Sequence, residues 1–353
     1  MLVNRYRRDV GVSGRGLRGL RSVRTAAVIS GARAKQYSVC LSQAEAMWAA
    51  AARVSTVASP ILRYYALLQA VWAVIAASNL SNADWRPRAS HGVEVDVRPR
   101  SGVLDLADVT VSALQSGAAI TLASALGTPL LARSATLESL IAALPTQPLV
   151  VTGGSVPTAM TVEVDAADWE ITLMGIGEHL EGDELASVMG LIESYPTFAK
   201  LPQPTRVHLD PAEAAERRAY LNWGRNSPVR SVADLPDFVD IWRVDGSGHG
   251  RGEALILPAV GGNSSAQHPL LTWFLVLHAF SILARYHPSA WQRLLDVDSS
   301  PKAVLLEQLI DTDSADALVL VEEAIEEFRH PSRGFGDGDG PPEAPNAMQH
   351  DGG

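Results

Sequence analysis

The stretch HPLLTWFLVLHAFSILARYHPSAW, residues His268 to Trp291, decides the fold of this chain. Almost every residue from Leu270 to Leu283 is apolar, and a helix that is apolar on all sides belongs in a protein interior or in a membrane. The apolar run of about 14 residues is shorter than the roughly 18 to 20 residues that span a bilayer. The sequence therefore predicts a buried core helix over about residues 269–286 and no membrane span.

A second stretch of the same kind, ILRYYALLQAVWAVIAAS, follows Pro60 and ends near Ser78. Proline is tolerated in the first turn of a helix, so Pro60 marks the expected start. Arg63 and Gln69 lie inside this stretch, and both side chains would be costly in lipid. We therefore expect a second buried helix over about residues 60–78, packed against the first one at the centre of the core.

Valine-rich segments between the two helices alternate as strands do. HGVEVDV (91–97) and ADVTVSA (107–113) are separated by proline and glycine, which predicts a hairpin. Further strands are expected in WEITLMGI, TRVHL, DIWRV and EALILP, with a helix that starts at Asp210 between TRVHL and DIWRV. The predicted fold class is α+β, mainly α, with β-rich insertions at about residues 91–113 and 160–258.

The same patterns divide the chain into five parts. Ser42 and Glu45 have the spacing of a capping box, so the first folded element is expected to begin near Ser42. A segment rich in Gly, Pro and Thr, residues 146–166, is the predicted boundary within the folded region. The expected parts are a disordered basic arm (1–36), an N-terminal helical core segment with the hairpin (37–145), a β-rich insertion (146–260), a C-terminal helical segment that completes the core (261–330) and a disordered tail (331–353).

Composition and charge narrow the class of protein. The 47% hydrophobic and 19% charged residues are those of an ordinary soluble globular protein, and a single cysteine, Cys40, excludes an internal disulfide and favours the reducing cytoplasm. Residues 1–36 carry a net charge of +8 and residues 37–353 a net charge of −18. An acidic body argues against non-specific nucleic-acid binding by the folded part. For residues 1–36, a signal peptide and an arm that contacts nucleic acid or a membrane are alternatives to disorder.

The search for catalytic and metal motifs finds none of the common ones. The chain has no P-loop, no G-x-G-x-x-G, no G-x-S-x-G and no H-E-x-x-H. The nine histidines lack the spacing of metal ligands, so we predict neither a metal site nor a cofactor.

Two polar stripes on the apolar helices predict a pocket. His278, Ser281 and Arg285 follow one another at helical spacing, as do Tyr65 and Gln69 on the other helix. The arginine has a planar fork of donors that suits a carboxylate or phosphate. We expect a small anionic ligand, with Arg285 as its anchor, in a pocket lined by Tyr65, Gln69, His91, Ser281, Arg285 and His287. The alternative is structural: a serine bonded to its own backbone, a satisfied core histidine and an arginine that reaches solvent.

A different class of function is suggested by Arg86 and His91. Their Arg-x4-His spacing resembles that of HEPN-type ribonucleases, which cleave RNA without a metal. In that family the pair lies on a helix, whereas here it lies beside Pro87 and precedes a predicted strand. The ribonuclease is therefore the alternative hypothesis, with Arg86 and His91 as catalytic residues and RNA as a partner only in that case.

Several segments, taken in order, resemble the YaaC-like family of bacterial proteins. AKQYSVCLSQAEAMWAAAARV, SPILRYYALLQAVWAVIAA, Ser90 to Val93, Gly117 to Gly127 and FSILARYHPSAW carry the resemblance, and the last is the most specific. The match covers roughly residues 34–328, with a poorly matching middle at about 145–250. Relatives usually have a basic residue where this chain has Trp72. The resemblance implies the fold and a bacterial, cytoplasmic context but no activity. We therefore expect a non-catalytic or weakly catalytic binding or regulatory protein.

Overall fold

The structure is a computed structural model. It describes residues 31–78, 85–99, 104–145, 156–165, 170–174, 184–209, 218–229, 241–247 and 251–329, together with Ile29 and Leu80. The predicted tail and all of the predicted arm before Gly31 except Ile29 lie outside the described residues. Helices dominate the described chain and the strands form two antiparallel sheets, so the predicted mainly α, α+β fold class is confirmed.

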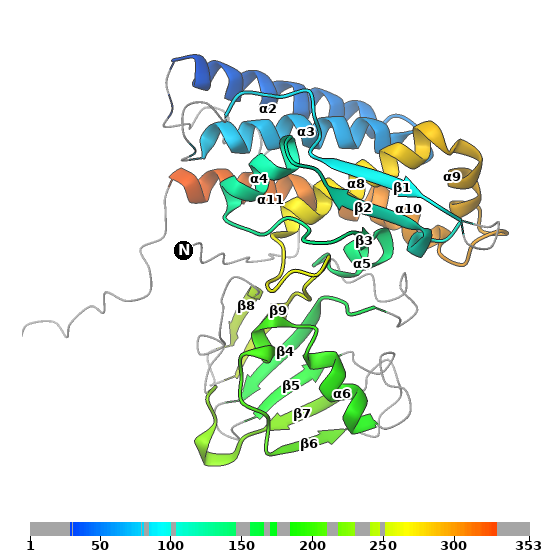
Figure 1. Ribbon diagram of the computed structural model, residues 1–353. Coiled ribbons are helices and arrows are strands. Elements are labelled where there is room, and N and C mark those ends of the chain that lie inside the picture. The colour runs from blue at the N-terminus through cyan, green and yellow to red at the C-terminus, as the bar shows by residue number, and fades with distance from the viewer. Residues whose placement is uncertain are drawn as a thin grey trace, which may run out of the picture.

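The two predicted core helices are present and pack against each other. They are α3 (Ser59–Ala77) and α8 (Pro269–Tyr286), and each has its proline in the first turn. The side chains of both helices are buried on almost every side, as their all-round apolar sequences predict. Figure 1 shows α3 lying between α2 (Gly31–Ala51) and α8. Both helices are long and apolar enough to cross a membrane, and most of each is covered by the rest of the protein.

The first helix begins earlier than the sequence indicates. α2 starts at Gly31, so Gly31 to Gln36, which we assigned to a disordered arm, form its first turns. The cause is tertiary: the guanidinium of Arg33 donates to four carbonyls in the last turn of α3 and just after it, among them that of Ala76 at 2.6 Å. The last carbonyls of an α-helix lack backbone N–H partners within the helix, and Arg33 supplies donors here, beside the Ser78 hydroxyl that also donates to the Ile75 carbonyl.

A small three-stranded sheet, from the sequence between α3 and α8, packs against the helical core. β1 (Val93–Val97) and β2 (Val109–Ala113) pair antiparallel, so the predicted hairpin is confirmed, and β3 (Ala135–Thr136) adds a third strand. α4 (Ala118–Leu126) ends at Gly127 in the left-handed conformation, and Thr136 caps α5 (Leu137–Ala142).

The second sheet has six strands in the order β6-β7-β5-β4-β9-β8 (Figure 1). Its strands are β4 (Met160–Asp165), β5 (Glu170–Met174), β6 (Arg206–Leu209), β7 (Arg218–Asn222), β8 (Ile241–Ser247) and β9 (Arg251–Ile256). The helices α6 (Glu184–Ile192) and α7 (Pro196–Ala199) belong to the same part of the chain, and α6 packs over one face.

Two strands of this sheet were not predicted. We read residues 146–166 as a bridge, but Met160 to Asp165 form β4, a central strand. Its buried residues alternate strictly with partly buried Thr, Glu and Asp, a strand pattern that the neighbouring Gly, Pro and Thr residues obscure in the sequence. β7 falls where we placed a helix starting at Asp210; residues 210–217 lie outside the described residues.

The C-terminal helices complete the helical core. They are α9 (Pro288–Leu294), α10 (Ala303–Asp311) and α11 (Asp316–Arg329), and α11 packs against both α3 and α8. Arg63, which is buried within α3, donates to Ser314 and pairs with Asp311 at 3.4 Å. Segments more than 200 residues apart in sequence therefore build one hydrophobic core.

Candidate functional site

A cluster of polar side chains lies between α3, α8 and the segment that leads into β1. The hydroxyl of Tyr64, on α3, and Nδ1 of His91 are hydrogen-bonded at 2.6 Å. The ring of His278, on α8, lies against both of them, with its centroid 4.7 Å from that of Tyr64 and 5.0 Å from that of His91. Phe274 packs on Tyr64 one turn earlier along α8. Three separate segments thus bring two histidines and a tyrosine into contact at the edge of the helical core.

The position of His91 is set by the backbone around it. The N–H of Ala119, in the first turn of α4, donates to the His91 carbonyl at 2.9 Å. Gly92 and Gly117 approach so closely that a Cβ on Gly117 would lie 2.3 Å from the Gly92 nitrogen. Only glycine allows this approach, so the close contact of two backbone segments fixes the imidazole beside Tyr64 and His278.

The protonation states of the cluster follow from burial and from the charge of Arg285. Burial, and secondarily Arg285, lower the pKa of His91. Burial, then His91 and Arg285, lower the pKa of His278 to about 3. Burial raises the pKa of Tyr64 far above its usual value. Both imidazoles are therefore neutral at pH 7 and the phenol keeps its proton. The direction of the Tyr64–His91 hydrogen bond depends on the imidazole tautomer: when Tyr64 donates to Nδ1, the imidazole proton is on Nε2.

Arg285, in the last turn of α8, supplies the positive charge of the cluster. Its Nε donates to the Ser281 carbonyl at 3.0 Å, Nη1 to the Tyr65 hydroxyl at 3.2 Å and Nη2 to Ser281 Oγ at 3.4 Å. The rings of Tyr65 and Tyr286 lie 5.7 and 5.1 Å from its Cζ. Within the described part of the chain, no carboxylate pairs with this guanidinium.

Of the six residues of the predicted pocket, the structure brings Tyr65, Ser281 and Arg285 into direct contact. His91 joins them through its contact with His278 and through the charge of Arg285. Ser281 also donates to the His278 carbonyl at 2.8 Å, which is the backbone bond that the structural alternative expects. These contacts fix the positions of the four side chains. The role of these residues in ligand binding stays a prediction.

The other two predicted residues are less closely tied to the cluster. Gln69 is partly buried one turn after Tyr65 on α3. His287 lies between α8 and α9, where its backbone N–H donates to the Leu283 carbonyl and its carbonyl accepts from the Trp291 N–H. His287 therefore joins two helices through its main chain.

Sequence reasoning missed two members of the cluster. Tyr64 was not singled out, because it is not on the stripe of Tyr65, and only the tertiary structure places it beside His91. For His278 the structural alternative expected a satisfied core histidine, yet its buried Nδ1 has no hydrogen-bond partner among the residues that the structure describes. The sequence does carry a signal for His278, because its helical spacing places it on one stripe with Ser281 and Arg285.

The alternative with Arg86 and His91 requires both residues on one helix face, and this geometry is not found. Arg86 lies in a bend and His91 two residues before β1, both outside any helix. Arg86 places its guanidinium over the ring of Trp85, 5.6 Å from the centroid. Among the described residues, no group of three or more His, Cys, Asp or Glu side chains could hold a metal ion.

The chain is thus a mainly helical α+β protein whose helical core carries a cationic cluster at Arg285. The YaaC-like protein family matches residues 21–325, and the chain belongs to this family. The resemblance of the separate sequence segments is therefore confirmed. No curated protein matches the chain, and no solved structure does.

Proposed function

We propose that this YaaC-like protein is a binding or regulatory protein that holds a small anion at Arg285 and His91, without a need for catalysis. One observation carries the proposal: Arg285 is partly buried, and no carboxylate among the described residues neutralises it. A charge that has lost part of its hydration is costly unless an opposite charge or several hydrogen bonds compensate for it. A bound anion would supply this compensation.

The donors that Arg285 retains support an anionic ligand. A guanidinium has five N–H groups, and the hydrogen bonds to Ser281 and Tyr65 use one on each of its three nitrogens. One N–H remains on each terminal nitrogen. Carboxylates and phosphates accept from two such donors at once, which makes arginine the usual anchor for both.

His91 offers a further donor of the right kind. In the tautomer in which Tyr64 donates to Nδ1, the proton of the neutral imidazole is on Nε2, and no described group accepts from that nitrogen. A neutral N–H donor beside a permanent cation suits an anion and disfavours a second cation. The role of Tyr65 is to hold the guanidinium from the α3 side.

The test compares Arg285→Gln with Arg293→Gln, which removes the same charge from an exposed position on α9. Inorganic phosphate, acetate and succinate are titrated into each protein by isothermal calorimetry. We expect at least one of these anions to bind the wild type, and Arg285→Gln to weaken its binding about tenfold or more, since hydrogen bonds to charged groups contribute about 1.5–3 kcal/mol. Arg293→Gln should bind as the wild type does.

Two outcomes would contradict the proposal. One is that none of the three anions binds the wild type, and the other is that Arg285→Gln binds the anion with unchanged affinity. A circular dichroism spectrum of each variant shows whether the fold is retained.

We also propose the bacterial cytoplasm as the location. Cys40 is the only cysteine and is buried as a free thiol, which suits a reducing compartment. The two helices that are long enough for a membrane lie mostly inside the protein, as core helices do.

A further inference from the structure

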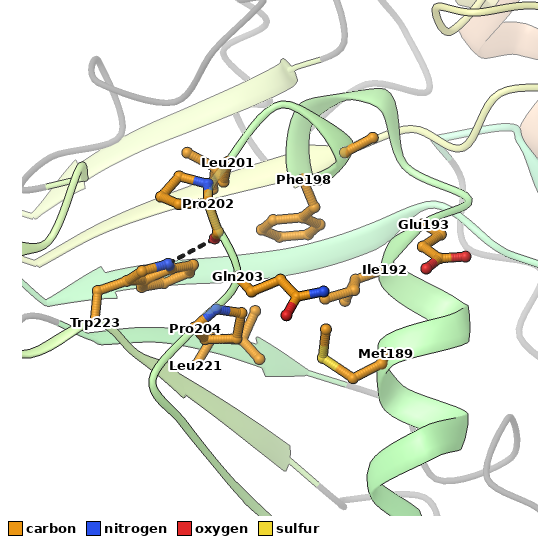
Figure 2. A pocket seen from close by; sticks show the side chains of 11 residues that line it. Met189, Ile192, Glu193, Phe198, Leu201, Pro202, Gln203, Pro204, Leu221 and Trp223 are labelled. Carbon is orange, nitrogen blue, oxygen red and sulfur yellow. Dashed lines mark hydrogen bonds between the residues drawn. The ribbon is translucent and has the colours of Figure 1, made fainter.

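The six-stranded sheet and its helices form a pocket that is separate from the Arg285 cluster. Figure 2 shows it between α6, the turn that follows α7, and the end of β7. Its buried floor is apolar and aromatic and consists of Ile192, Phe198, Leu221 and Trp223. Met189, partly buried on α6, closes one side. The exposed lining residues Glu193, Ala199, Pro202 and Gln203 mark its mouth.

The aromatic wall of the pocket is fixed in the unbound protein. Trp223 Nε1 donates to the Pro202 carbonyl at 2.8 Å, which orients the indole and satisfies its only donor (Figure 2). Pro202 and Pro204, on either side of Gln203, stiffen the turn that faces it. A preformed wall of this kind lowers the entropy that a ligand must lose on binding.

The size of the pocket selects a small ligand. Its volume is about 140 Å³, which is close to the roughly 150 Å³ of an apolar cavity that accepts benzene. One six-membered ring therefore fills it, and a two-ring molecule would extend through the mouth. The flat faces of Trp223 and Phe198 favour an aromatic ring, which can stack on one face and meet the edge of another.

The charge at the mouth selects the polar group of the ligand. Glu193 is the one charged residue among those that line the pocket, and it is exposed directly after the end of α6. Gln203 reaches from the turn toward Ile192 and offers an amide oxygen (Figure 2). A carboxylate and an amide oxygen accept from a donor such as an amine, and the carboxylate repels an anion.

We propose that this pocket binds a small molecule with one aromatic ring and an ammonium or other hydrogen-bond donor on a short arm. The ring occupies the floor between Phe198, Leu221 and Trp223. The donor group reaches Glu193 at the mouth. This site shares no residue with the Arg285 cluster, and its ligand has the opposite charge to the anion proposed there.

The test uses benzylamine, benzyl alcohol and benzoate, which share the ring and differ in charge. The indole N–H signal of Trp223 is observed in a two-dimensional ¹H–¹⁵N spectrum and assigned by its loss in Trp223→Phe; the other seven of the eight tryptophans serve as internal references. We expect benzylamine to shift this signal with a dissociation constant on the order of 1 mM or below, as suits a ligand of this size. Benzyl alcohol should bind more weakly, and benzoate the most weakly.

Three variants separate the parts of the proposal. Met189→Trp should fill the pocket and abolish the shift. Ala199→Trp, at an exposed position of the mouth, serves the same purpose if the first variant does not fold. Glu193→Gln should weaken benzylamine about two- to fivefold, the range for an exposed ion pair, and leave benzyl alcohol unchanged. The proposal is overturned if benzylamine leaves the Trp223 signal in place, if folded blocked variants still respond, or if benzoate binds as tightly as benzylamine.

Discussion

At the scale of single residues, the imidazole of His278 carries an unusual cost. Its side chain is buried on α8, and its Nδ1 has no hydrogen-bond partner within the described part of the chain. A buried polar atom without a partner loses its hydration and gains nothing in return. The His278 ring instead packs against the rings of Tyr64 and His91, and this aromatic contact offsets part of the cost of the missing hydrogen bond. Such a site resists protonation because a charged imidazole would have no compensation.

This cost predicts a loss of stability in acid. The pKa of His278 is lowered to about 3 in the folded protein, against about 6.5 in an unfolded chain. The stability that comes from keeping His278 neutral is therefore fully present above pH 6.5. It is lost as the pH falls from there toward 3, because in this range only the unfolded state takes up the proton. At pH 5 the loss is about 2 kcal/mol. Burial also lowers the pKa of His268 to about 3 and that of His91, so urea unfolding at pH 7 and pH 5 isolates the His278 contribution only as the difference between the wild type and a His278 variant.

His278→Phe keeps a ring and removes the titrating group, so its loss of stability between pH 7 and pH 5 should be smaller by about 2 kcal/mol. At pH 7 it should be as stable as the wild type or more so, because the unsatisfied nitrogen is gone. His208→Phe, at an exposed position of β6, should keep the pH dependence of the wild type. An unchanged pH dependence in His278→Phe would contradict this account of the site.

At the scale of elements, the contact between the start of β1 and the start of α4 depends on two glycines, Gly92 and Gly117. Gly117 has φ +135°, which side chains rarely adopt, and a Cβ there would lie 2.5 Å from the Gly92 Cα. The close approach lets the first turn of α4 bind the carbonyl before β1, as seen in the Ala119 to His91 hydrogen bond. The strand, the helix and the imidazole of the cluster are therefore positioned by one contact.

Gly117→Ala should lower the free energy of unfolding by about 2–4 kcal/mol, since both the backbone conformation and the contact with Gly92 are strained. Its control is Gly190→Ala, in α6, where a Cβ would meet nothing within 4 Å. That change should stabilise the protein by about 0.5–1 kcal/mol, as alanine does within a helix. Equilibrium unfolding in urea compares the two variants. Equal stability of Gly117→Ala and the wild type would show that the contact is not tight.

At the scale of the whole molecule, the described residues form two hydrophobic cores. One lies among the helices and the small sheet, and the other lies between the six-stranded sheet and α6 and α7. They meet where β9 ends, since Leu255 and Leu257 belong to the helical core and Ile256 to the sheet core. The alternation of side chains along one strand thus serves both cores.

Two separate cores predict local rather than global effects of core substitutions. Leu173→Ala, in β5, should cost about 2–5 kcal/mol and lower the hydrogen-exchange protection of the six-stranded sheet, with α3 and α8 less affected. Leu277→Ala, at an equally buried position of α8, should have the reverse effect. Hydrogen–deuterium exchange followed by mass spectrometry reads both regions. If either substitution lowers protection equally in both, the cores unfold as one unit.

The sequence by itself determined the helices, the hairpin and the fold class, because each follows from a local pattern. An all-round apolar run can only be buried, which fixed α3 and α8, and valine alternation fixed β1 and β2. The glycine that ends α4 and the threonine that caps α5 are also local signals.

Only the tertiary structure decided the start of α2 and the composition of the polar cluster. α2 extends to Gly31 because Arg33 binds the end of another helix. Tyr64 meets His91 from 27 positions away, and Arg285 meets Tyr65 from 220 positions away. The helical and strand periodicities of the sequence cannot predict contacts between residues so far apart in the chain. These contacts are set when apolar helices are packed face to face, and the polar side chains that remain must find partners across the interface.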